Sequence, residues 1–390
     1  MHRRVRRGRR RRHGRFVPIG RPPGVTAVAN VPEARKIGAM RHRQQVRFVK
    51  ASDGTRLAWA ESGRGPVVVK AANWLTHLEY EWDSPVWRHW IEFFSEHWRF
   101  VRHDERGCGM SDWHPGRLDL EQWAADLGSI IDAAEPDGPV TLLGISQGAA
   151  TCIRYAVEHP HRVARLVLYG GYAHGAFHRT TATEHRAMIA LARASWGKDN
   201  PTFRQVFTSR FIPGGTPEQL QWYNDLCLKT TTGEVVAALL EARGAIDIVD
   251  LLASVSVPTL VLHARNDEVI PLSEGRLLAS AIPGAQFVEL DSRNHILLED
   301  EPAWDRFRDA VLSFLQPDAA STGAAFEVLS TREREVLALM TEGLGNADIA
   351  ARMHISEKTV RNHASNVFDK LGVWSRAQAI VFARDHGFRR

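Results

Sequence analysis

Residues 142–150 read LLGISQGAA and place a tight turn between a strand and a helix. The apolar run VTLL leads into GISQG, and the helical stretch GAATCIRYAVEHP follows it. Gly144 and Gly148 let the backbone pack closely around a strained turn, which leaves the Ser146 hydroxyl at the start of the helix. Because the amide groups at a helix N-terminus can stabilise an oxyanion, the pattern indicates a nucleophilic serine.

The surrounding sequence has the pattern of a sheet covered by helices. From residue 46 to about 316, short apolar runs such as PVVVKAA, PVTLLG and PTLVLHA alternate with longer amphipathic segments. This alternation predicts a mostly parallel sheet flanked by helices. The strand pattern is interrupted between about residues 172 and 250, where stretches such as GEVVAALLEARGA predict a helical cap.

Composition suggests two domains and a leader. The stretch QPDAASTGAA mixes Pro, Ser, Gly and Ala ahead of a new helical pattern, so we expect a linker at 317–326. It would join a domain at 41–316 to a second domain at 327–390. Residues 1–40 contain 12 of the 50 Lys and Arg residues and one acid, and they show no periodicity. We expect a disordered leader there; an arm that contacts phosphates is the alternative.

A serine alone is a weak nucleophile at neutral pH and needs a base and an orienting acid. Asp267 comes just after the apolar run PTLVLHA, and His295 comes just after the next run, AQFVEL. Since the carboxyl ends of parallel strands meet at one edge of a sheet, both side chains are candidate partners of Ser146. The alternative is that both residues satisfy local turns.

Residues 45–316 resemble the α/β-hydrolase superfamily through GISQG, through the two residues after the later strands, and through the turn RHDERGCGMSD. The resemblance implies an α/β hydrolase fold with Ser146 as nucleophile, Asp267 as acid and His295 as base. It implies acyl chemistry without a metal or a cofactor. Epoxide and haloalkane chemistry are disfavoured, because on this fold they use an aspartate in place of the serine.

One segment departs from the family pattern. Many members place a His-Gly pair after the third strand to shape the oxyanion hole, whereas this chain has Asn73 and Trp74. We expect backbone N–H groups of this segment and of Gln147 to act as donors. The neighbourhood is rich in tryptophan, which predicts either core and cap packing or an aromatic pocket for an apolar substrate. The tryptophans concerned are Trp74, Trp82, Trp87, Trp90 and Trp98.

Beyond residue 327 the sequence predicts four short helices. Ser330 and Glu333 have the spacing of a capping box, and Ser356 caps the stretch EKTVRNHASNVFDKLG. Apolar residues recur in that stretch at helical spacing and predict one buried stripe: Val360, Ala364, Val367 and Leu371. The opposite face carries short or forked hydrogen-bonding side chains and no acid: Arg361, Asn362, Ser365 and Asn366.

Residues 327–388 resemble the LuxR-type helix-turn-helix domain through LSTREREVL, GLGNADIAARMHIS and KTVRNHASNVFDKLGVWSRAQAI. The resemblance implies binding to double-stranded DNA. It implies base contacts from Arg361, Asn362 and Ser365, and phosphate contacts from Thr359 and Lys370; we expect Lys358 and Asn366 to complete this surface. Ten basic and eight acidic residues give 324–390 a net charge of only +2, so we expect a homodimer to be needed for tight binding.

Cysteine usage and hydropathy bear on the compartment. The three cysteines are far apart and odd in number, which argues against both a disulfide framework and a zinc site. No apolar run approaches the roughly 20 residues that cross a bilayer. We therefore expect a cytoplasmic protein that does not associate with membranes.

The two motifs together favour a transcription regulator whose hydrolase-like domain reads a small molecule. In this interpretation that domain binds or cleaves a small-molecule ester, thioester or lactone. A serine hydrolase with an accessory DNA-binding tail is one alternative. A catalytically silent ligand receptor is the other.

Overall fold

The computed structural model describes most of the chain: residues 43–179, 181–198, 202–316, 326, 328–371, 373, 375–385 and 388. We call residues 43–316 the N-terminal domain and residues 326–388 the C-terminal domain. The expected leader at 1–40 and nearly all of the expected linker at 317–326 lie outside the described residues.

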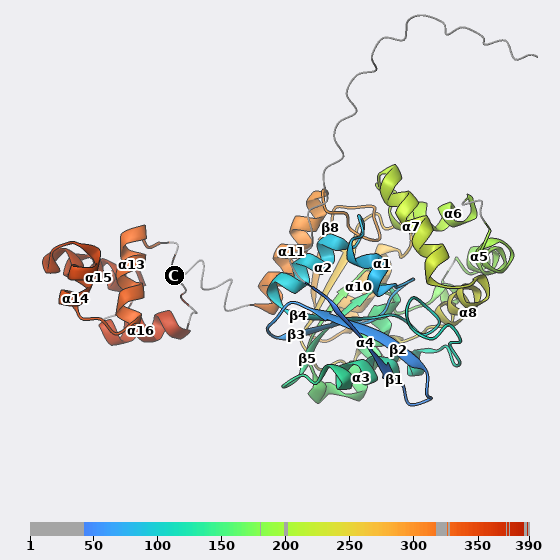
Figure 1. Cartoon of the computed structure of the whole chain (residues 1–390), viewed down its shortest axis with the longest axis horizontal. Coiled ribbons are helices and arrows are strands. Elements are labelled where there is room, and N and C mark those ends of the chain that lie inside the picture. Colours follow the sequence, from blue (N-terminus) through green and yellow to red (C-terminus); the bar gives the residue numbers. More distant parts are fainter. Residues whose placement is uncertain are drawn as a thin grey trace, which may run out of the picture. The chain divides into compact units, whose positions relative to one another are not determined.

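An eight-stranded sheet is the centre of the described N-terminal domain, with the strand order β1-β2-β4-β3-β5-β6-β7-β8 (Figure 1). β1 and β2 pair antiparallel, as do β2 and β4, and every later pairing is parallel. The strands are β1 Gln45–Lys50, β2 Arg56–Ser62, β3 Val67–Lys70, β4 Arg99–His103, β5 Val140–Ile145, β6 Val163–Tyr169, β7 Thr259–Ala264 and β8 Gln286–Leu290.

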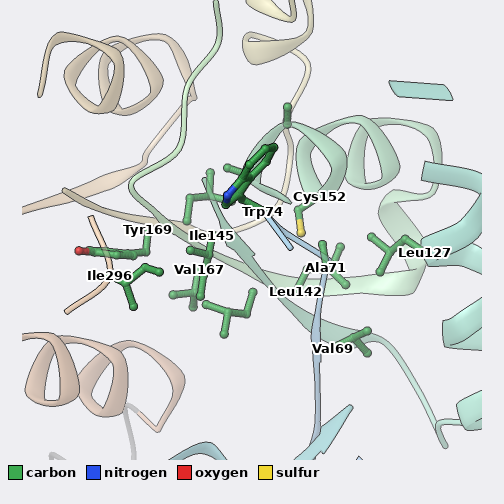
Figure 2. Close-up of a cluster of buried hydrophobic side chains, with 14 of the residues drawn as sticks. Val69, Ala71, Trp74, Leu127, Leu142, Ile145, Cys152, Val167, Tyr169 and Ile296 are labelled. Atoms are coloured by element: carbon green, nitrogen blue, oxygen red, sulfur yellow. The ribbon is translucent and has the colours of Figure 1, made fainter. Parts of the chain in front are cut away.

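The central strands are buried on both faces, which explains their nearly continuous apolar sequences. Every residue of β7 is buried, and in β5 all but Thr141 are buried. Figure 2 shows side chains of three adjacent strands in one cluster, Val69 of β3, Leu142 and Ile145 of β5, and Val167 of β6. This core holds the carboxyl ends of the strands in fixed positions.

Helices flank the sheet, and α5 to α8 lie together in the segment between β6 and β7 where the sequence predicts a cap (Figure 1). α7 begins with a capping box formed by Thr216 and Gln219. The helices are α1 Leu78–Trp82, α2 Arg88–His97, α3 Leu120–Ala134, α4 Gln147–Glu158, α5 Ala182–Ser195, α6 Thr202–Phe211, α7 Pro217–Thr230, α8 Gly233–Gly244, α9 Val249–Leu252, α10 Leu272–Ala281 and α11 Pro302–Leu315, with 3-10 turns η1 Pro160–Arg162 and η2 Ala176–His178.

The C-terminal domain is helical and has its own apolar core. Its helices are α13 Thr331–Thr341, α14 Asn346–Met353, α15 Glu357–Leu371 and α16 Arg376–Asp385. Ser330 and Glu333 form the expected capping box at the start of α13. The expected stripe of α15 is buried against the other helices: Val360, Ala364, Val367 and Leu371.

Two further observations concern the helices and the cysteines. Across the described ranges, no helix is both long enough and apolar enough to cross a bilayer. Cys108, Cys152 and Cys227 are each buried and unpaired. Burial raises the pKa of the Cys152 thiol and of the Cys227 thiol, the latter to about 12, so neither is a thiolate at neutral pH.

Candidate active site and DNA-binding surface

Ser146 occupies a strained turn between β5 and α4. Its φ of 56° lies in the left-handed region, and its N–H donates to the Tyr169 carbonyl at 2.9 Å. A Cβ atom on Gly144 would lie 2.6 Å from the Ala149 Cα, so the turn requires glycine at that position. The first glycine of GISQG therefore has a steric cause, because its missing side chain lets α4 begin directly after the serine.

Asp267 and His295 meet in the structure although 28 positions separate them. Asp267 follows β7 and His295 follows β8, and the Nδ1–H of His295 donates to Asp267 Oδ2 at 2.6 Å. The other carboxylate oxygen accepts from the backbone N–H groups of Val269 and Ile270, at 2.8 and 2.9 Å. Burial opposes ionisation of Asp267, but the interactions with His295 outweigh it and hold the pKa of Asp267 below its usual value.

The second nitrogen of His295 is buried, and within the described residues Nε2 has no hydrogen-bond partner. The ring lies against Gly170, where a Cβ atom would come within 3.1 Å of His295 Cε1. Gly170 directly follows Tyr169, whose carbonyl holds the Ser146 backbone. The serine turn and the histidine ring therefore both pack at the carboxyl end of β6. Hydrogen bonds between a catalytic hydroxyl and an imidazole are often long without substrate and commonly shorten in the reacting complex.

The loop after β3 lies beside the start of α4. The Gln147 side chain donates from Nε2 to the Ala72 carbonyl at 2.9 Å, which fixes the loop against the helix. Lys70 Nζ donates to Asn73 Oδ1, so the Asn73 side chain is already engaged. Burial lowers the pKa of Lys70 to about 8. Donors for an oxyanion would therefore be backbone N–H groups, including that of Gln147, which as first helical residue has no intrahelical acceptor.

A cavity of about 120 Å³ opens at Ser146. Its aromatic wall comes from the β3 loop, from the strand end after β6 and from α6: Trp74, Tyr172, Phe207 and Phe211. Trp74 stacks on Phe207 and Phe211, with ring centroids 5.8 and 6.2 Å apart. Of the five tryptophans noted above, Trp74 lines this cavity, and the others pack in the core or, for Trp82, against it.

The end of α6 is bonded to the loop that carries His295. The Phe211 carbonyl accepts from the backbone N–H of His295 at 2.8 Å and from that of Ile296 at 3.2 Å. The Phe211 ring also meets the His295 ring edge-on, with centroids 5.2 Å apart. The cap and the histidine are therefore held together by main-chain hydrogen bonds as well as by ring packing.

Three arginines also line the cavity, and no sequence pattern indicated them. They are Arg179 after η2, Arg210 in α6 and Arg243 in α8. Each belongs to a helical or irregular segment in which arginine usually marks a solvated surface. Their side chains converge only because the cap folds over the strand ends.

The exposed face of α15 carries the expected hydrogen-bonding side chains: Arg361, Asn362, Ser365 and Asn366. Lys358 is exposed as well, and Thr359 is half-buried beside Ser356, whose hydroxyl caps the helix by accepting from the Thr359 N–H at 3.1 Å. The buried stripe fixes which face of the helix is presented to solvent.

Two of the basic residues expected on DNA form ion pairs within the domain. Arg361 Nη1 donates to Glu357 Oε1, one turn earlier, at 2.7 Å, and both side chains are exposed. Lys370 Nζ donates at 2.7 Å to Oε2 of the buried Glu333. Together with the Ser330 cap, this ion pair lowers the pKa of Glu333 to about 2.

Three known proteins illustrate what this chain is similar to. A pyrrolizixenacetamide deacetylase of Xenorhabdus hominickii is 26% identical over 248 residues, 62% of this chain and 88% of that protein. The AB hydrolase superfamily protein YisY of Bacillus subtilis is 25% identical over 260 residues, 64% of this chain and 91% of that protein. The structure of an enol-lactonase from Burkholderia xenovorans aligns with a TM-score of 0.59 and 25% identity, over 69% of this chain and 99% of the other.

The fold and these similarities define an α/β hydrolase joined to a helix-turn-helix DNA-binding domain. Residues 90–302, more than half of the chain, match the α/β-hydrolase family described as serine aminopeptidase, S33, and the chain belongs to that family. Residues 327–383 match the family described as bacterial regulatory proteins, luxR family. Both resemblances seen in the sequence, and the predicted fold class, are thereby confirmed.

Proposed function

We propose that this protein is a transcription regulator whose hydrolase domain binds and hydrolyses a small-molecule ester, thioester or lactone. The main observation in its favour is the hydrogen bond between His295 and Asp267. This bond leaves the buried Nε2 of the imidazole free at the carboxyl end of β6, which also holds the Ser146 backbone. A luxR-family domain in the same chain supports DNA as the second partner. The deacetylase and enol-lactonase names of two similar proteins support acyl-bond cleavage as the chemistry.

In the proposed mechanism, Ser146 Oγ attacks the substrate carbonyl while His295 Nε2 takes the hydroxyl proton. Asp267 stays ionised because of its lowered pKa, and it stabilises the imidazolium that forms. Backbone N–H groups of Gln147 and of the Asn73–Trp74 segment stabilise the oxyanion. The imidazolium then protonates the leaving alcohol or thiol, and water, activated by the same base, releases the acid from Ser146.

Hydrolysis of a panel of p-nitrophenyl esters, acyl thioesters and lactones tests the proposal. The wild-type protein is expected to hydrolyse at least one class, and Ser146→Ala is expected to hydrolyse none above background. Equal rates for the two proteins would remove Ser146 from the chemistry. One observation favours a receptor without turnover as the second candidate: Asn73 and Trp74 stand where many family members have a His-Gly pair, and the Asn73 side chain is already bound to Lys70.

The ligand is proposed to act on DNA binding through dimer geometry. Two recognition helices must fit successive half-sites, so a ligand that favours one arrangement of a homodimer changes affinity for the operator. α16 is the proposed dimer element, by its place at the end of the luxR-family domain. Sedimentation with and without operator DNA measures the oligomeric state, and a monomer bound to a full operator would contradict the dimer.

Arg361→Ala and Asn362→Ala are each expected to reduce specific DNA affinity by about 1–3 kcal/mol and to relax discrimination at one position of each half-site. Both side chains are exposed on α15, and Arg361 can contact a base edge once it exchanges its ion pair with Glu357. Binding to the operator and to single-base variants of it gives the measurement. Arg332→Ala is the matched control, since it removes an exposed arginine of α13 that is paired with Glu335. Unchanged base preference in both variants would place the DNA on another face.

Lys370→Ala is expected to weaken binding to all DNA sequences about equally and to reduce the salt dependence by roughly one phosphate contact. Because Lys370 is also bonded to Glu333, the lysine could instead act only through this ion pair. Glu333→Gln separates the two roles, because it removes the acid and keeps the lysine. Equal losses of affinity in the two variants would show that Lys370 acts through the fold of the domain.

A further inference from the structure

The cavity at Ser146 is mostly apolar but strongly cationic. Its lining contains the three arginines Arg179, Arg210 and Arg243 and one acid, Glu184, which is exposed. The lining therefore combines an aromatic wall with three arginines. This combination implies a ligand with both an apolar part and a negative charge.

Arg243 is the most buried of the three, with 5% of its surface exposed. Its guanidinium lies over the Trp74 ring, 5.0 Å from the centroid, and its Nη2 donates to Glu105 Oε2. Within the part of the chain that the structure describes, Nε and Nη1 of Arg243 are buried without a hydrogen-bond partner. Buried guanidinium donors are almost always satisfied in folded proteins, so Arg243 retains hydrogen-bonding capacity that no described residue uses, at a cavity that it lines.

Arg179 adds a second cation, and unlike Arg243 it forms no ion pair with the described residues. Its guanidinium lies over Tyr172, 5.4 Å from the ring centroid, and among described residues its buried Nε has no partner. Burial lowers the pKa of Arg179, but an arginine side chain remains protonated in proteins. Arg210, in contrast, is held at the rim by two donations to the Glu268 carbonyl. Arg179 and Arg243 are therefore the pair available to a ligand.

The local chemistry favours a carboxylate over a phosphate. Planar guanidinium groups match the two oxygens of a carboxylate, and such charge-assisted bonds are strong where water is excluded. Glu105 already occupies one side of Arg243 and contributes a negative charge. Two arginines and Glu105 leave one positive charge, which a monoanion balances. A dianionic phosphate would add a second negative charge close to the Glu105 carboxylate.

We propose that the site selects acyl compounds that carry a free carboxylate, bound by Arg179 and Arg243 while the scissile carbonyl lies at Ser146. This specificity rests on the proposed hydrolase function. A cavity of about 120 Å³ is comparable with the roughly 150 Å³ cavity that admits benzene in a protein core, so the acyl chain is short. Arg179 and Arg243 act as specificity-determining residues, and the acyl transfer itself is unchanged.

Two esters of equal carbon number test the proposal. Monoethyl glutarate and ethyl pentanoate carry the same ethyl ester on a five-carbon chain, which ends in a carboxylate or in a methyl group. The acid released at constant pH is titrated to give kcat/KM. The wild-type protein is expected to prefer monoethyl glutarate by at least about tenfold, the range of a hydrogen bond to a charged group. A ratio near one, or a preference for ethyl pentanoate, would overturn the proposal.

Arg179→Gln is expected to reduce this preference about tenfold or more. The substitution leaves no buried carboxylate unpaired, because Arg179 forms no ion pair with an acid among the described residues. Arg193→Gln is the matched control, since Arg193 is an exposed arginine of α5 that pairs with Glu241 and does not line the cavity. If both variants change the preference equally, the effect is general charge steering and the proposal fails. Arg243→Gln is combined with Glu105→Gln, so that no buried charge is left unpaired, and the same loss of preference is expected.

A binding measurement keeps the carboxylate question separate from turnover. Calorimetry with the full-length Ser146→Ala variant is expected to detect monoethyl glutarate, with weaker binding after Arg179→Gln is added. If the wild-type protein hydrolyses neither ester but this binding difference is found, the hydrolase function fails and the carboxylate site stands. If hydrolysis occurs without any difference in binding or preference, the carboxylate site fails and the hydrolase function stands.

Discussion

A fluorophosphonate probe is expected to label the wild-type protein at Ser146, and His295→Ala is expected to abolish the labelling. The probe reacts with a serine whose proton is accepted by a neighbouring base, and the free Nε2 of His295 is the available base at this end of the sheet. Nucleophile and base act as a unit, so loss of either typically reduces the rate on the order of 10⁴-fold. Peptide mapping of the labelled protein identifies the modified residue.

Asp267→Asn is expected to slow labelling strongly but less than His295→Ala, because the amide can still contact the ring but cannot stabilise its charged form. His161→Ala is the matched control, since His161 is exposed in η1. Unfolding midpoints of all variants establish that the domain is folded. A folded wild-type protein that binds DNA and is not labelled would instead support the receptor without turnover.

The second large effect concerns stability: Arg106→Met is expected to lower the free energy of unfolding of the N-terminal domain by about 3–5 kcal/mol. Arg106 is fully buried, and it donates twice to Asp126, at 2.6 Å each, and once to Asp53 at 2.8 Å. The substitution leaves Asp126, which is 2% exposed, without its cation. Urea unfolding followed by tryptophan fluorescence gives the measurement.

Two further variants show whether the loss comes from an unpaired charge. Adding Asp126→Leu to Arg106→Met is expected to recover much of the stability, because a buried pair replaced by apolar groups is often nearly neutral. Arg162→Ala breaks the more exposed pair with Asp132 and is expected to cost only about 0–1 kcal/mol. If the double variant is as unstable as Arg106→Met alone, the loss of stability comes from lost packing and not from the unpaired Asp126 carboxylate.

The fold was predictable because its signals are local. The turn at Ser146 needs glycine at position 144 for steric reasons, the buried parallel strands need continuous apolar runs, and the stripe of α15 needs helical spacing. The order of serine, acid and histidine follows from strand order, so Asp267 and His295 could be proposed from their positions after two apolar runs.

The pocket was not predictable, because its residues are brought together by tertiary packing alone. Arg243 lies in the last turn of α8, where a basic residue is ordinary, and Glu105, its partner, is 138 positions earlier in the chain. Similarly, the pairing of Lys370 with Glu333 joins α15 to the start of α13 and has no signature in the spacing of either helix. Side chains that act through distant partners carry no local pattern.

The two hydrogen bonds from the His295 loop to the Phe211 carbonyl constrain how the pocket can exchange its contents. A displacement of the end of α6 that breaks them also withdraws the main-chain support of His295. An outward displacement of α6 and a fully supported His295 therefore exclude one another. A compound that wedges α6 outward would act as an inhibitor without touching Ser146.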